Sequence, residues 1–81
     1  MAGSVVWRYT ARDRVHDCYF GNDDEGRHLV AFVCNAAGSA GTDPPWGAYF
    51  IESSLLLHDR ADFPSVEAAK QFVEALIALE R

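Results

Sequence analysis

The chain has 81 residues, 49% of them apolar and 12% aromatic, and its formal net charge at pH 7 is −5. This composition is typical of one small globular domain spanning residues 1–81 and excludes a disordered chain. The acidic balance disfavours nucleic-acid and anionic-membrane binding, no apolar run approaches the ~20 residues that cross a bilayer, and no secretory signal is recognisable, so we expect a cytoplasmic protein.

Three strands are predicted in the first half of the chain. Residues 5–10, VVWRYT, alternate in character, and the apolar set that includes Trp7 is predicted to face the core. Residues 15–20 and 28–34 form the second and third strands, joined as a hairpin by the turn at residues 22–26. The third strand is apolar on both faces, which indicates a central place in the sheet.

The middle of the chain is its least patterned part. Residues 35–45 are rich in small side chains and end in Pro44 and Pro45, which cannot donate hydrogen bonds to a strand ladder. A segment of this length is either a partner-binding loop or only a connection. Residues 46–52 are predicted as the fourth strand, and residues 54–58 either continue it or form a fifth.

The C-terminal helix has the strongest pattern. Ser65 is the predicted N-cap, and Glu67 in the first turn and Arg81 at the end suit the helix dipole. The apolar side is broader than one sheet contact usually needs and consists of Val66, Ala69, Phe72, Val73, Leu76, Ile77 and Leu79.

These elements predict an α+β fold. We expect a single small antiparallel sheet of three to five strands, in β-β-β-β order, packed against one C-terminal amphipathic helix. The surplus apolar surface of the helix also suggests a homodimer joined through that helix.

The histidines and cysteines predict neither a metal site nor a catalytic centre. If the hairpin turn is centred on residue 24, His16, Cys18, His28 and Cys34 share one face. Neighbours along a face are ~7 Å apart, which is too far to converge on zinc or to join the two cysteines in a disulfide. Adjacent His–Asp pairs on a strand point to opposite faces, so they make no acid–base dyad. We therefore predict no enzyme activity, no metal and no cofactor.

We predict that the protein works by binding another protein that has a basic surface. It would be a small acidic interaction module, comparable in style to accessory or inhibitor proteins of mobile elements, and its partner would handle nucleic acid. The predicted partner-binding residues are Asp23, Asp24, Glu25, Asp43 and Trp46. A tryptophan that follows two prolines either anchors a partner or closes the end of the core.

Two alternative functions stay open. One is nucleic-acid or small-ligand binding on the arginine-bearing face of the sheet, by Arg8, Arg12, Arg14, His16 and Trp46. It is weakened because Trp7 and Tyr9 lie on the face opposite those arginines. The other is a structural homodimer subunit.

Overall fold

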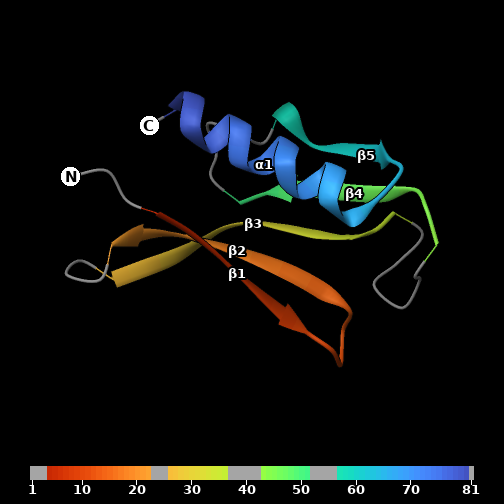
Figure 1. Ribbon diagram of the computed structural model, residues 1–81, viewed down its shortest axis with the longest axis horizontal. Coiled ribbons are helices and arrows are strands. Elements are labelled where there is room, and N and C mark those ends of the chain that lie inside the picture. Colours follow the sequence, from red (N-terminus) through yellow and green to blue (C-terminus); the bar gives the residue numbers. More distant parts are fainter. Residues whose placement is uncertain (1–3, 23–25, 37–42, 52–56, 81) are drawn as a thin grey trace.

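The computed structural model describes residues 4–22, 26–36, 43–51 and 57–80. Its elements in chain order are β1 (Ser4–Thr10), β2 (Val15–Asn22), β3 (Gly26–Asn35), β4 (Trp46–Phe50), β5 (Arg60–Phe63) and α1 (Val66–Glu80) (Figure 1).

All five strands form one antiparallel sheet whose spatial order follows the chain, β1-β2-β3-β4-β5. Each strand thus pairs with its neighbour in sequence, as short connections favour. The helix α1 lies across one face of the sheet, mainly against β3, β4 and β5, while the connection between β1 and β2 lies away from it (Figure 1). The predicted α+β fold, with one antiparallel sheet and a C-terminal helix, is confirmed.

The β2–β3 hairpin contains a β-bulge that the sequence pattern does not predict. Phe20 pairs with His28, as expected for the predicted turn. Tyr19 keeps this register by pairing with Leu29, but between Tyr19 and Cys18 the register shifts, and Cys18 pairs with Ala31. Val30 is therefore the extra residue of the bulge, and both Val30 and Ala31 are fully buried. The register expected from the turn therefore holds only near the turn, from Tyr19 to Asn22 on β2.

A fifth strand exists, but it lies later than the segment considered for it. β5 covers Arg60–Phe63, after a short 3₁₀ turn at residues 57–58. Asp59 lies between them, and its Oδ1 accepts a hydrogen bond from the Phe50 backbone N–H (2.9 Å). Residues 52–56 lie outside the described residues.

The helix begins as the sequence predicts. Ser65 Oγ accepts a hydrogen bond from the Ala68 N–H (3.1 Å), which is the contact of an N-cap. Most of the broad apolar side is used against the sheet: Ala69, Val73 and Ile77 are buried, and Val66, Phe72 and Leu76 pack around them. Leu79 stays 81% exposed, so the surplus that favoured a helix-mediated dimer is small. No helix among the described residues is long and apolar enough to cross a membrane.

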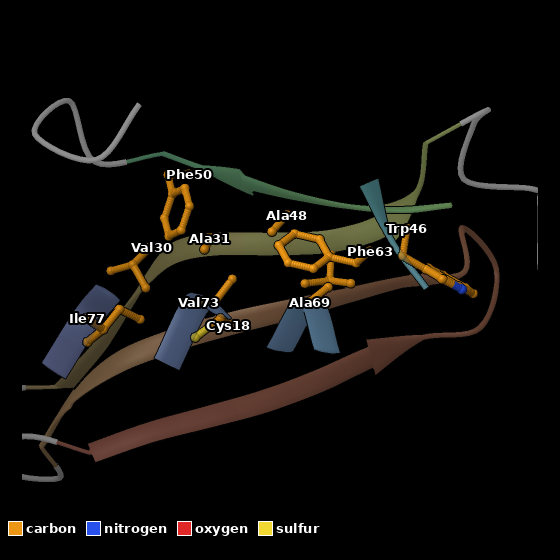
Figure 2. Close-up of a cluster of buried hydrophobic side chains, with 11 residues drawn as sticks. Cys18, Val30, Ala31, Trp46, Ala48, Phe50, Phe63, Ala69, Val73 and Ile77 are labelled. Atoms are coloured by element: carbon orange, nitrogen blue, oxygen red, sulfur yellow. The ribbon is translucent and has the colours of Figure 1, made fainter. Parts of the chain in front are cut away.

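The core lies between α1 and the sheet (Figure 2). Phe72 of the helix contacts two strand rings, with centroid distances of 5.1 Å to Phe63 and 6.1 Å to Phe50. Trp46 pairs with Phe63 at the start of β4 and is only 8% exposed. This burial favours the interpretation that Trp46 closes the end of the core, because so little of its ring is left to anchor a partner.

The two ends of the segment at residues 35–45 are tied together. The Ala36 N–H donates to the Pro45 carbonyl (3.0 Å), and Asn35 Nδ2 donates to the Asp43 carbonyl. Asn35 is buried, so this bond satisfies a polar group inside the fold. Residues 37–42 lie outside the described residues, and whether the segment binds a partner stays a prediction.

Truncating the buried helix side should cost far more stability than truncating the exposed side. Ile77→Ala, at a side chain only 3% exposed, should lower the free energy of unfolding by about 2–5 kcal/mol. Leu79→Ala, two residues later, should change it by less than ~0.5 kcal/mol. Urea unfolding followed by tryptophan fluorescence measures both variants, and similar losses in the two would contradict the packing described above.

Candidate functional site

The second face of the sheet is the main surface that the fold leaves for function. No described helix or strand lies over it, whereas α1 covers the other face (Figure 1). The open face, as we name it, consists of Val6, Arg8, Asp17, Tyr19, Leu29, Phe32, Cys34, Gly47, Tyr49 and Ile51. Cross-strand pairing aligns Val6 with Tyr19 and Leu29 in one row, and Arg8 with Asp17, Phe32 and Tyr49 in the next. None of these residues belongs to the hydrophobic core.

The β-bulge at Val30 determines which β3 side chains reach the open face. A shift of one residue exchanges the faces of a strand. Without the extra residue, Phe32 would face the helix. In the structure Val33 takes that place and is fully buried, while Phe32 and Cys34 are half-buried on the open face.

Two aromatic rings form the centre of the open face. Phe32 and Tyr49 are cross-strand neighbours whose rings stack, with centroids 5.3 Å apart and planes inclined by 28°. The Tyr49 ring also lies over Gly47, where a Cβ atom would overlap it. Burial raises the pKa of the Tyr49 phenol, and the nearby Cys34 and Asp59 add to the rise. The hydroxyl is therefore protonated at neutral pH and available as a hydrogen-bond donor.

Charged side chains border this aromatic centre on the β1 side. The Arg8 guanidinium lies 5.5 Å from the centroid of the Tyr19 ring, within the range of a cation–π contact. Asp17 is the cross-strand neighbour of Arg8, so the two charges offset each other. Arg27 Nη2 donates to Ser4 Oγ (3.2 Å) at the far end of the sheet. The open face is thus apolar and aromatic with a nearly neutral margin.

The helix side of β1 is already engaged within the chain. Trp7 Nε1 donates to a Glu74 carboxylate oxygen (2.6 Å), and Lys70 Nζ lies 5.1 Å from the centroid of the Trp7 ring. Tyr9 and His16 form a tilted ring pair with centroids 4.5 Å apart. Burial, and then the charge of Lys70, lower the pKa of His16. These contacts fasten β1 to α1.

The structure corrects the predicted placement of the histidines and cysteines. Cys34 pairs with Gly47 and lies on the open face, because the bulge at Val30 reverses the faces of the rest of β3. His16 and Cys18 lie on the helix side of the sheet. Neither cysteine is disulfide-bonded. Among the described residues, no group of three or more His, Cys, Asp or Glu side chains could hold a metal ion.

Two of the five predicted partner-binding residues, Asp43 and Trp46, lie in the described part of the chain. Asp43 is exposed, whereas Trp46 is buried. Asp23, Asp24 and Glu25 lie outside the described residues, so their predicted role stays a prediction.

Sequence reasoning missed the aromatic residues of the open face, Tyr19, Phe32 and Tyr49. The signal for Tyr19 and Tyr49 was present, because each alternates with core residues in its strand. The side of the sheet on which Phe32 lies could not be predicted, because it depends on a bulge for which the β3 sequence contains no signal.

The chain matches no family model, no curated protein and no solved structure.

The stability of the fold should fall in alkali because of Cys18. Burial, and then the charge of Glu74, raise the pKa of this thiol from 9.0 to about 12. Between these values the unfolded chain loses a proton that the folded chain keeps, so the free energy of unfolding should fall as pH rises from 9 toward 12. Cys34 and Tyr49, whose pKa values are also raised, act in the same direction.

Urea unfolding across this pH range, in wild type and Cys18→Ala, measures the effect. The slope with pH should be shallower in Cys18→Ala, and Cys34→Ala serves as a control for a half-buried thiol. An unchanged slope in Cys18→Ala would show that the Cys18 thiol is not held protonated by the fold.

Proposed function

We propose that this protein is a non-enzymatic interaction module that binds another protein through the open face of its sheet. The observation that carries the proposal is the uncovered row of aromatic and aliphatic side chains centred on Phe32 and Tyr49. Tyrosine, phenylalanine and arginine are enriched at protein interfaces, and lysine, glutamate and aspartate are depleted. The open face follows this composition except at Asp17, and the register places Arg27 on the same side at the end of the sheet.

The proposed partner has an apolar patch within a basic surface. The net charge of −5 attracts a basic protein at long range and raises the rate of encounter. The described acidic side chains outside the open face are concentrated in the second half of the chain and outnumber the basic ones there. The acidic residues are Asp43, Asp59, Asp62, Glu67 and Glu74, and the basic residues are Arg60 and Lys70. In this proposal the acidic groups orient the encounter and the open face provides the contact. A nucleic-acid-handling protein, the partner class predicted from the sequence, has a basic surface of the kind that such an encounter requires.

One observation favours nucleic-acid binding as a second candidate. Arg8 shares its face with three aromatic residues, whereas the sequence suggested that arginines and aromatics lie on opposite faces. Base stacking needs uncovered ring faces. Phe32 and Tyr49 cover part of each other, and Arg8 lies over Tyr19. Together with the negative net charge, these contacts favour a protein partner.

Removing apolar surface from the open face should abolish partner binding without unfolding the domain. The variants are Tyr49→Ala and Ile51→Ala, and the matched control is Leu79→Ala, an exposed apolar residue on the helix. Affinity capture from source cells, done with nuclease treatment and at several salt concentrations, compares them. Capture should be lost in the open-face variants, kept in Leu79→Ala, and weakened by salt because the partner is basic.

The same experiment decides between the candidates. Equal capture by all variants would contradict docking on the open face. A titration of the chain with a mixed-sequence single-stranded oligonucleotide, followed by the ring proton shifts of Phe32 and Tyr49, tests the second candidate. Large shifts at low salt, with capture sensitive to nuclease, would replace the protein partner by nucleic acid.

A further inference from the structure

The two edges of the sheet differ in how well they are protected against pairing. β5 is four residues long, carries Arg60 and Asp62, and is followed by Pro64. Arg60 and Asp62 form a two-bond ion pair, with N–O distances of 3.0 Å. A short, charged edge that ends at proline resists the addition of another strand.

The opposite edge, β1, is less well protected. It is seven residues long, contains no proline, and has Arg8 as its charged residue. Its composition, SVVWRYT, is rich in β-branched and aromatic residues. A long edge strand of this kind presents unpaired backbone N–H and C=O groups to any strand that approaches.

Both faces of β1 also leave apolar surface uncovered. Val6, on the open face, is 39% exposed, and Tyr9, on the helix side, is 53% exposed. α1 packs mainly against β3, β4 and β5 and contacts β1 at Trp7 through Glu74 and Lys70 (Figure 1). A strand added along the outer edge of β1 would cover both exposed side chains.

We propose that two copies of the chain pair through β1, antiparallel, and join their five-stranded sheets into one continuous sheet. The full length of the strand is used when the two-fold axis passes at Trp7, the midpoint of Ser4–Thr10. In this register Ser4 pairs with Thr10 of the second copy, Val5 with its Tyr9, Val6 with its Arg8, and Trp7 with its Trp7.

This register is complementary on both faces. A two-fold axis perpendicular to the sheet places helix-side residues opposite helix-side residues, so apolar Val5 meets aromatic Tyr9 of the second copy. Pairs of β-branched with aromatic residues, and of serine with threonine, stabilise antiparallel strands. The hydrogen bond from Trp7 to Glu74 holds the axial side chain in a fixed orientation. The strand thus meets matching residues of a second copy at Ser4–Thr10 and Val5–Tyr9, and Val6 lies opposite Arg8.

The pairing has a consequence for the open face but does not depend on it. Two joined sheets present two open faces side by side on one surface. A partner could then contact both copies, which raises avidity without any new contact within one copy.

Hydrogen exchange of the wild-type protein tests the pairing directly. Sedimentation velocity should show the mass rising from one chain to two with concentration. Over the same range, alternate backbone amides of β1 should become protected, because only every second residue of an edge strand points its N–H outward. The ring protons of Phe32 and Tyr49 should not shift, which distinguishes strand pairing from docking on the open face.

Charge substitutions at Val6 test the register. Val6→Glu places a carboxylate opposite Arg8 of the second copy and should lower the dimer dissociation constant several-fold, whereas Val6→Lys should raise it several-fold. Net charge alone predicts the reverse, since Val6→Lys reduces the repulsion between two acidic chains. Ile51→Glu and Ile51→Lys are the matched controls, at an exposed site on the β4 side of the sheet.

Three results would overturn the proposal. They are a monomer at every concentration, a dimer whose β1 amides stay unprotected, and equal responses to Val6→Glu and Val6→Lys. Amide spectra of the variants establish that each is folded, and the exchange measurement needs no variant at all. Loss of pairing with retained partner capture would leave the proposed function intact.

Discussion

The structure depends on the packing of one helix side against one face of a twisted sheet. Val73 and Ile77 are buried at this contact, and burial of such a side chain stabilises a fold by about 1.5–3 kcal/mol. Two such side chains give about 3–6 kcal/mol, which is comparable with the whole stability of a small domain. Because α1 is a single helix, it covers β3, β4 and β5 on one side only. The uncovered sheet face and the uncovered edge strand both follow from this one-sided arrangement.

The bulge at Val30 connects the core to the surface. It lets two successive residues, Val30 and Ala31, contribute to the core, and it reverses the faces of the rest of β3. Phe32 is thereby moved outward beside Tyr49, and Cys34 is separated from Cys18. A local irregularity of one residue therefore decides that the exposed side of the sheet is aromatic and that the thiols and imidazoles do not converge.

Periodicity predicted the fold well because it reports directly on burial. The capped helix that begins after Ser65 and the β2–β3 hairpin are confirmed, and in β1 the predicted alternation holds for Val5 and Trp7 but not for Tyr9, which is 53% exposed. The candidate site was predicted poorly, for two physical reasons. The direction in which the β3 side chains point depends on the bulge, and an apolar sequence gives no pattern from which a bulge can be predicted. The burial of Trp46 depends on its pairing with Phe63, which is distant in sequence. Burial, unlike periodicity, is a property of the assembled sheet.

Two features of the molecule support the proposed role in recognition: an acidic chain, and an apolar sheet face bordered by the offset charges of Arg8 and Asp17. The central claim is that this face is open to solvent in the isolated chain. Relaxation of side-chain protons by a soluble paramagnetic agent measures that exposure residue by residue. We expect strong relaxation at Tyr49 and Ile51 and little at Val33 and Val73. Equal protection of both sets would show that the open face is covered in the isolated chain.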